Sequence, residues 1–198
     1  VTCTATDDWD NTASATFNVT VVDTTAPTFT NLPADQIIEA TSPSGAVLTY
    51  AAVTAADAVD QSPVVSCNVA TGSTLSLGVT VVTCSASDAS GNMRSGSITV
   101  TVQDTTPPIL TLPEDMATEA VGPTGASVKY SASANDMVDG TVSVNCTPAS
   151  GSTFAIGSTT RVDCSSVDSS GNTATGSFNV TVHDTTPPVL SLPFDITA

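Results

Sequence analysis

The chain has very few cationic residues. Three Lys and Arg stand against nineteen Asp and Glu in 198 residues, which gives a formal net charge of −16. A nucleic-acid-binding protein needs clustered cations to displace counterions from phosphates, and three scattered cations form no such patch. The same shortage excludes electrostatic binding to an anionic membrane surface. A chain of this charge attracts cations instead, Ca²⁺ included.

Aromatic residues are also scarce, at 4% of the chain, and long runs of Leu, Glu, Lys and Gln at helical spacing are absent. Val, Ala, Ile, Leu, Thr and Ser make up much of the sequence, and Val, Ile and Thr suit half-buried strands. The composition therefore predicts an all-β protein. No apolar run approaches the roughly 18 to 20 residues that cross a bilayer, so we expect no membrane insertion in this segment.

Recognisable catalytic motifs are missing. His183 is the single His, and no motif places a nucleophile against it. No Gly-rich phosphate loop precedes a helix, and the acidic residues lie in predicted surface loops without the aromatic residues that a sugar site would use. We therefore predict that the chain is not an enzyme.

A repeat of about 80 residues dominates what the sequence does contain. Asp-Thr-Thr begins at Asp23, Asp104 and Asp184. Other pairs recur in the same register: Leu-Pro at 32, 112 and 192, Glu-Ala at 39 and 119, and Asp-x-Ser-Gly-Asn at 88 and 168. The pattern predicts complete repeats at 24–104 and 105–184, the C-terminal part of a repeat at 1–23 and the N-terminal part of another at 185–198. We infer a segment of a longer array. Completion of the broken ends by strand exchange is the weaker alternative, because those ends together lack a repeat's middle strands.

Alternating apolar residues and turn residues mark short strands within a repeat. Segments 96–102 and 80–87 alternate, and 47–56 and 64–67 are further candidates, separated by Gly- and Ser-containing turns. About seven short strands in about 80 residues fit a two-sheet sandwich. The predicted fold is a tandem of immunoglobulin-like β-sandwich repeats. The Pro-Pro pairs at 107 and 187 restrict the backbone to extended conformations, so we expect short, semi-rigid linkers that join the repeats end to end.

One ordered set of motifs resembles a known family. Val-Asn-Cys-Thr-Pro-Ala-Ser-Gly-Ser-Thr-Phe-Ala-Ile-Gly spans 144–157 and continues through Cys164 to Asp-Ser-Ser-Gly-Asn at 168–172. Together with the Asp-Thr-Thr-Pro-Pro opening, it resembles the hyalin repeat, or HYR domain, over the whole chain. The resemblance implies an immunoglobulin-like sandwich related to fibronectin type III, found in extracellular and cell-surface proteins, with roles in adhesion and extracellular structure. Members often carry a second cysteine pair, whose positions here are Leu at 32, 112 and 192 and Gly at 96 and 176.

The five cysteines follow the repeat. Cys67 and Cys84 recur as Cys146 and Cys164, and Cys3 matches the second member of the pair. We therefore predict disulfides Cys67–Cys84 and Cys146–Cys164, with the partner of Cys3 upstream of the chain. One disulfide per repeat implies an oxidising, extracellular or cell-surface location. The alternatives are buried free thiols or a zinc site, and the latter lacks a close Cys pair.

Carboxylates recur where repeats meet, and they carry the sharpest functional hypothesis. In this topology the loop between the second and third strands, the last hairpin and the incoming linker lie at the end that faces the preceding repeat. Glu39 and Glu119 precede turns at the opposite end. A cation such as Ca²⁺, which takes six to eight oxygen ligands, would stiffen the junction. The alternative is turn chemistry alone, in which each Asp caps its own turn. The candidate ligands are Asp57, Asp60 and Asp88 of the first complete repeat with Asp23 of the linker before it, and Asp136, Asp139 and Asp168 of the second with Asp104 of the linker before it.

Three sequons, at Asn18, Asn145 and Asn179, are possible glycosylation sites. The combined features predict a non-catalytic extracellular module that requires no cofactor, with Ca²⁺ as the optional ligand. Its expected partners are neighbouring copies of the same protein or other extracellular molecules. We expect a structural filament or surface structure. The alternatives are the stalk of a cell-surface adhesin and the accessory domains of a secreted enzyme.

Overall fold

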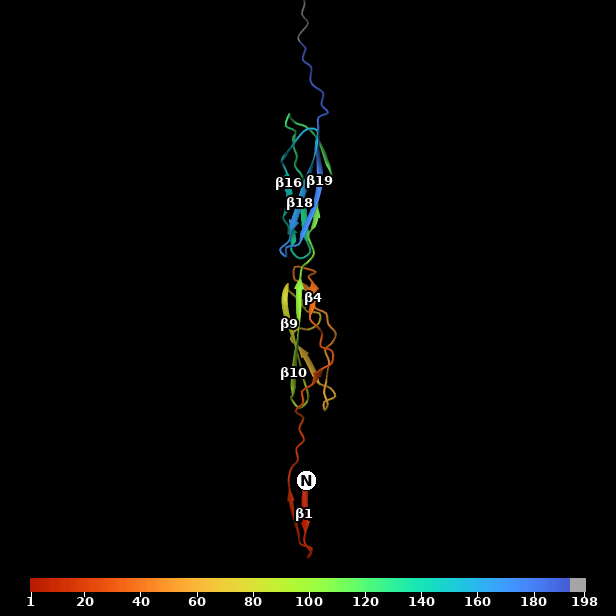
Figure 1. The fold of residues 1–198 in the computed structure, drawn as a ribbon, viewed down its shortest axis with the longest axis vertical. Helices are drawn as coiled ribbons and strands as arrows, with labels where there is room; N and C mark the ends of the chain where they lie inside the picture. Colours follow the sequence, from red (N-terminus) through yellow and green to blue (C-terminus); the bar gives the residue numbers. More distant parts are fainter. Residues whose placement is uncertain (193–198) are drawn as a thin grey trace, which may run out of the picture. The chain divides into compact units, whose positions relative to one another are not determined.

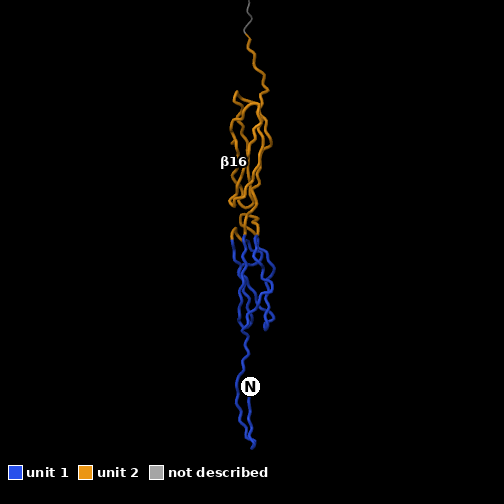
Figure 2. Tube along the Cα trace, viewed as in Figure 1, with its two compact units in different colours: residues 1–37, 47–74, 79–101 blue, residues 38–46, 75–78, 102–198 orange. Residues whose placement is uncertain are grey.

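The computed structural model describes residues 1–192, and every regular element in this range is a β-strand (Figure 1). No helix in the described part is long and apolar enough to span a membrane. The chain falls into two compact units, residues 1–37, 47–74 and 79–101 in one and 38–46, 75–78 and 102–198 in the other (Figure 2). The predicted segment 185–198 lies partly outside the described residues, and the repeat boundaries stay a prediction.

The second complete repeat is a β-sandwich. One sheet has the strand order β12-β19-β18-β16, and the facing strands form the sheets β11-β14-β15 and β13-β17. A hydrophobic core fills the space between them, built on Val162, Phe178, Val180 and Val182, which are at most 3% exposed. The strands are β11 (Ile109–Thr111), β12 (Met116–Glu119), β13 (Ala126–Ser127), β14 (Ser133–Asp136), β15 (Gly140–Val142), β16 (Val144–Thr147), β17 (Thr153–Phe154), β18 (Ser158–Val167) and β19 (Thr173–His183).

The first complete repeat has the same plan. Its main sheet has the order β4-β10-β9-β7, and the pairs β3-β6 and β5-β8 supply the facing strands. The strands are β3 (Thr28–Phe29), β4 (Gln36–Glu39), β5 (Ala46–Val47), β6 (Ala55–Ala56), β7 (Val64–Cys67), β8 (Thr74–Leu75), β9 (Gly78–Ser87) and β10 (Met93–Gln103). Before it, β1 (Thr2–Thr6) and β2 (Thr12–Thr16) form an antiparallel hairpin. The fold is therefore the predicted all-β tandem of sandwiches.

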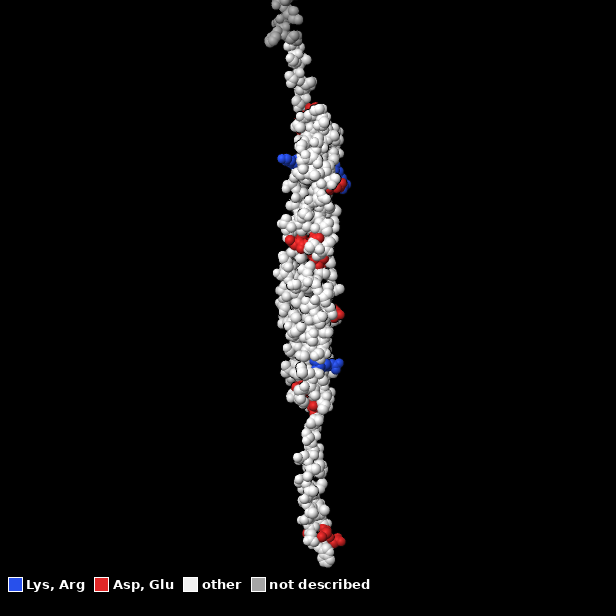
Figure 3. Space-filling view, turned by 90° about the vertical axis from the view of Figure 1, so that its left-hand side faces the viewer, with Lys and Arg blue, Asp and Glu red and all other residues white. Residues whose placement is uncertain are grey.

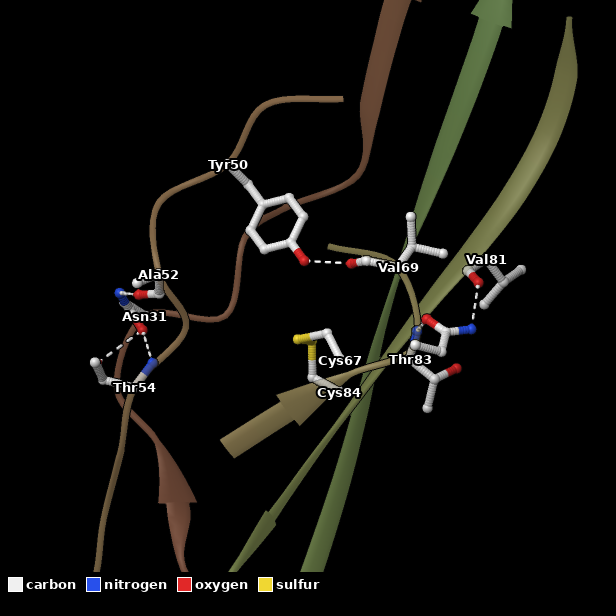
Figure 4. Close-up of a disulfide and its surroundings, with 10 residues drawn as sticks. Asn31, Tyr50, Ala52, Thr54, Cys67, Val69, Val81, Thr83 and Cys84 are labelled. Carbon is white, nitrogen blue, oxygen red and sulfur yellow. Dashed lines mark hydrogen bonds between the residues drawn. A yellow bond between two sulfur atoms is a disulfide. The ribbon is translucent and has the colours of Figure 1, made fainter. Parts of the chain in front are cut away.

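Most of the strand predictions are confirmed. Segment 64–67 is β7, while 80–87 and 96–102 lie inside β9 and β10. The prediction for 47–56 is wrong, because only its two ends are strands. Between them, side chains replace a strand ladder: the Asn31 amide donates to the Ala52 carbonyl at 2.7 Å, and the Tyr50 hydroxyl donates to the Val69 carbonyl (Figure 4). Alternation alone does not reveal such side-chain partners.

Both predicted disulfides are present. Cys67 pairs with Cys84 and Cys146 with Cys164, each joining directly opposed residues of neighbouring strands (Figure 4). In the chain-entropy model a loop of this length contributes about 3 kcal/mol to stability. Cys3 is exposed and unpaired within the described residues.

The positions of the family's second cysteine pair face one another in both repeats. A Cβ placed on Gly96 would lie 2.7 Å from Leu32 Cδ2, and one on Gly176 would lie 2.8 Å from Leu112 Cδ1. A leucine thus occupies the space beside a glycine, where the family often has a disulfide. The substitution keeps this site packed without a crosslink.

The Asp-Thr-Thr linker after each complete repeat is held by a glutamate at the end of β4 or β12. Glu39 accepts hydrogen bonds from the Thr105 amide at 2.7 Å, the Thr105 hydroxyl at 2.9 Å and the Thr106 hydroxyl at 3.0 Å. Glu119 makes the same three bonds to Thr185 and Thr186. The contact follows from topology, because β12 pairs in parallel with β19 and Glu119 lies opposite His183, two residues before Thr185. We call this arrangement the glutamate clamp.

The clamp keeps its glutamates ionised. The hydrogen bond from the Thr185 amide, with smaller contributions from the two hydroxyls and His183, lowers the pKa of Glu119 below its ordinary value of 4.5. The amide of Thr105 likewise lowers the pKa of Glu39. Because the folded-state pKa lies below the unfolded value, the clamp stabilises the fold at pH values above about 4.5 and is lost as the pH falls through the lower folded pKa.

The clamp predicts a pH-dependent effect of Glu119→Gln. At pH 7 the variant should melt at a lower temperature than the wild type, because a neutral amide replaces a carboxylate that accepts three hydrogen bonds. At a lower, acidic pH the difference should shrink, since protonation of the wild-type carboxyl removes its charge as the pH falls through its lowered pKa. Thermal melts at the two pH values measure this, with Glu114→Gln as the control at an exposed glutamate of the same repeat. Equal melting temperatures at pH 7 would contradict a stabilising clamp.

Candidate functional site

Each complete repeat brings three of its four predicted carboxylate ligands together. Asp23, Asp57 and Asp88 form one cluster, and each offers an oxygen within 4.8 Å of the others. Asp104, Asp136 and Asp139 form the second, with the same separation limit. Asp60 and Asp168 are the predicted members outside these triplets. We call the triplets the first and second carboxylate clusters.

In the second cluster, a tight turn and a hairpin tip position the carboxylates. Asp136 ends β14, and its Oδ1 accepts hydrogen bonds from the backbone amides of Val138 at 2.7 Å and Asp139 at 3.0 Å. The carboxylate of Asp139 accepts bonds from the amide and hydroxyl of Ser169, at 2.6 and 2.8 Å, in the tip between β18 and β19. These bonds fix the turn against the tip of the last hairpin.

The linker enters the second cluster through Asp104. Its Oδ2 accepts a hydrogen bond from the Ser170 hydroxyl at 3.2 Å, and its backbone carbonyl accepts one from the Asn172 side-chain amide at 3.1 Å. The same hairpin tip therefore holds both Asp139 and Asp104. Sequence spacing places all three segments at one end of the repeat, but it does not identify the serines that link them.

Asp168 has the turn-capping role of the alternative interpretation. Its two carboxylate oxygens accept hydrogen bonds from the backbone and side-chain amides of Asn172, both at 2.8 Å. Burial raises the pKa of Asp168, but the hydrogen bonds from Asn172, Gly171 and Ser170 outweigh it and leave the pKa below its ordinary value. An ionised Asp168 thus orients Asn172, which in turn holds the carbonyl of Asp104.

The first cluster is built from the same parts with a different third member. Asp57 Oδ1 accepts hydrogen bonds from the amides of Asp60 and Val59, which lower its pKa. Asp60 accepts a bond from the Ala89 amide at 3.0 Å and so takes the bracing position that Asp139 has in the second repeat. Asp23 Oδ2 is a buried oxygen that has no hydrogen-bond partner among residues 1–192. The first cluster therefore contains an acceptor with unused capacity.

Three of the six clustered carboxylates are buried, whereas Asp23 and Asp57 are half-buried and Asp139 is exposed. Asp136, Asp104 and Asp88 are 3%, 7% and 8% exposed. Within residues 1–192, the ion pairs are Arg161–Asp163 and His183–Glu119, and neither reaches a cluster. On the face in Figure 3, acidic residues gather in a few small groups, and the cationic residues are scattered, one of them against an acidic residue. Buried carboxylates at this separation repel one another, so the arrangement favours a bound cation.

The donor set indicates the class of cation. Every clustered group is an oxygen ligand, which suits hard ions such as Ca²⁺ and Mg²⁺, whereas zinc sites use Cys and His. Three carboxylates fall short of the six to eight oxygens that Ca²⁺ takes, so carbonyl, hydroxyl or water oxygens would complete the shell. The oxygen ligands that these residues offer are therefore of the type that Ca²⁺ binds.

The three sequons differ in their surroundings. Asn18 and Asn145 are exposed, and Asn145 lies on β16 at the edge of its sheet. Asn179 is half-buried on β19 between two strands, and its side-chain amide donates to Asp115 Oδ2 at 3.0 Å. Glycosylation at the three sites stays a prediction.

Comparisons with known proteins agree with the repeat. The HYR domain family matches residues 22–102 and 103–182. Hyalin of Strongylocentrotus purpuratus is 38% identical over 205 residues, covering 98% of this chain and 17% of that protein. Hyalin of Lytechinus variegatus is 36% identical over 209 residues, covering 99% of this chain and 39% of that protein. The chain thus spans well under half the length of either relative.

Solved structures give weaker similarity. Drosophila N-cadherin EC1-4 superimposes with a TM-score of 0.38 and 13% identity over 80% of this chain and 49% of that one. Human Protocadherin-24 EC1-2 superimposes with a TM-score of 0.36 and 18% identity, over 82% of this chain and 100% of that one. Similarities of this size carry no argument about function. The tandem family matches cover most of the sequence, and the chain belongs to the HYR domain family as a hyalin-like repeat module.

Proposed function

We propose that this chain is a non-catalytic structural segment of an extracellular array whose repeats assemble into a filament or surface layer. The observation that carries the proposal is the linker, which is held in the same way after both complete repeats. In each, a glutamate clamp binds the two threonines that follow the last strand. A sequence that repeats its junction hydrogen bonds as well as its core is suited to long, regular arrays.

Other features support an extracellular structural role. Each complete repeat carries a disulfide, which persists in oxidising compartments. The relatives in two sea urchins are both named hyalin, and this chain aligns with them over nearly its full length. The expected partners are neighbouring copies of the same protein.

Electron microscopy of the native material, with its ends unaltered, tests this function. Ordered filaments or sheets with a constant lateral repeat are the expected result, because the repeats then associate with each other. Isolated thin strings that end at a cell surface or a knob would contradict the proposal and favour an adhesin stalk.

We also propose that the carboxylate clusters bind Ca²⁺. The support is the second cluster, where Asp104 and Asp136 are buried beside Asp139 with no cationic side chain in range. A cation at this position would neutralise the repulsion and join the linker to the β14–β15 turn. Its removal would leave the hydrogen bonds of Ser169, Ser170 and Asn172 as the connection.

This proposal predicts opposite effects of Asp136→Asn with and without the ion. In Ca²⁺ at about 100 times the dissociation constant, the second repeat of the wild type should gain about 2.7 kcal/mol of stability, and the second repeat of the variant should lose most of this gain. In EGTA the variant should be at least as stable as the wild type, because asparagine keeps the Oδ1 acceptor and removes one repelling charge. Thermal melts of the wild type and the variant, each in Ca²⁺ and in EGTA, measure whether their order of stability changes.

Glu114→Gln makes the same charge change away from the clusters and serves as the control. Its response to Ca²⁺ should equal that of the wild type. A wild-type melting temperature that is the same in Ca²⁺ and EGTA would contradict the calcium proposal while leaving the structural role intact.

A further inference from the structure

Three strands of the main sheet of the first complete repeat, β7, β9 and β10, have outward side chains without charge, whereas Glu39 lies on the fourth strand, β4, and Asp35 directly precedes it. Along β9 and β10 the residues alternate between buried and outward positions, with Val82, Cys84, Ile98 and Val100 inward. The outward residues are Val79, Val81, Thr83, Ser85 and Ser87 on β9, and Met93, Ser95, Ser97, Thr99 and Thr101 on β10, with Val64 and Ser66 on β7 beside them. None of these side chains is ionisable. We call this set the outer face.

Large apolar side chains on the outer face are exposed. Val79 and Val64 are each 68% exposed, Val81 is 53% exposed and Met93 is 65% exposed. The second repeat lacks this character at equivalent positions, where Thr159 and Arg161 replace Val79 and Val81. The Arg161 side chain is in addition engaged with Asp163 at 2.7 Å. The apolar outer face is therefore a property of the first repeat and not of the fold.

The net charge of the chain restricts what can approach this surface. Nineteen acidic residues and a net charge of −16 make most contacts between two copies repulsive. A contact between two outer faces is less repulsive than most, because their own side chains carry no carboxylate, and Asp35 and Glu39 flank them at the β4 edge of the sheet. The same face on both copies also satisfies the symmetry of a two-fold contact, in which each partner uses one surface.

The size of the outer face suits a weak, repeated contact. The ten residues of β9 extend about 34 Å at about 3.4 Å per residue, and three strands span about 14 Å. Each copy would cover about 500 Å², or about 1,000 Å² for the pair, which is near the lower limit of specific interfaces. Such a contact is weak in one chain, but a long array repeats it and gains avidity.

We propose that the outer face is a lateral self-association surface whose partner is the same face of a second copy of this chain. The inference rests on the proposed structural function and specifies which repeat makes the contact between neighbouring chains. Repeats with the chemistry of the first one associate, and repeats with the charged sheet surface of the second one act as spacers.

Sedimentation equilibrium of the 198-residue chain tests this surface. Cys3→Ser in every sample prevents intermolecular disulfides, and about 0.5 M NaCl screens the net charge. As the concentration rises towards about 1 mM, the average mass should rise from 19.7 kDa towards that of a dimer. Val79→Glu with Val81→Glu should lower the association constant at least tenfold, because two like charges would face two others. Val79→Thr with Val81→Thr should weaken it severalfold without any charge.

Thr173→Glu with Thr175→Glu adds the same charge at two exposed positions, two residues apart on one strand of the second repeat, and is the matched control. It should associate as the wild type does, and circular dichroism should show all variants folded. A wild type that stays monomeric to about 1 mM, a valine-to-glutamate variant that associates normally, or a control that is equally impaired would each overturn the proposal. If native material forms filaments but the purified chain does not associate through the outer face, the proposed structural function stands and the proposed contact is wrong. If the chain associates through the outer face but native material forms no filaments, the contact stands and the proposed structural function is wrong.

Discussion

Hydrogen bonds from two directions hold the Asp-Thr-Thr linker, and the site depends on them. Glu39 binds Thr105 and Thr106 from β4, the strand beside β10, and Asn172 binds the carbonyl of Asp104 from the hairpin tip of the following repeat. Both groups are fixed by secondary structure, since Glu39 ends β4 and Asn172 begins the return strand of a hairpin. A three-residue linker with so many partners has little freedom left. The following Pro-Pro pair restricts the backbone further.

This constraint explains why carboxylates gather where they do. The linker cannot be held without bringing Asp104 to the tip of the β18–β19 hairpin, and the turn that carries Asp136 and Asp139 is bound to the same tip through Ser169. Three acidic groups then share one place and repel one another. The same hydrogen bonds that order the linker therefore create the repulsion that the proposed Ca²⁺ would relieve.

The sequence predicted the long strands, the disulfides and the regions that hold the clusters. Period-two alternation in β9 and β10 is strong because one side is fully buried, as Val82 and Val100 show. The prediction for segment 47–56 failed because its middle part is held by side-chain hydrogen bonds, such as those of Asn31 and Tyr50, and not by a strand ladder. Which three of the four aspartates converge differs between the repeats, although Asp60 and Asp139 both accept a hydrogen bond from the hairpin tip. That difference is a matter of a few ångströms that spacing does not encode.

The hydrogen-bond partners of Glu39 and Glu119 could be identified only from the register of the sheet. Sequence reasoning placed Glu39 and Glu119 near the following junction, but their threonine partners appear only once β12 is aligned in parallel with β19. The contrast between the outer faces of the two repeats required the alternation to be resolved into inward and outward positions. Only then do Val79 and Val81 stand out as exposed apolar groups in a strongly acidic protein.

Backbone ¹⁵N relaxation at Thr105 and Thr106 tests the central claim that the linker is held as firmly as the strands. The amide order parameters should be about 0.85, as in rigid backbone, and should fall when Glu39 is replaced by Gln. Values below about 0.6 in the wild-type chain would show a flexible linker and contradict the account.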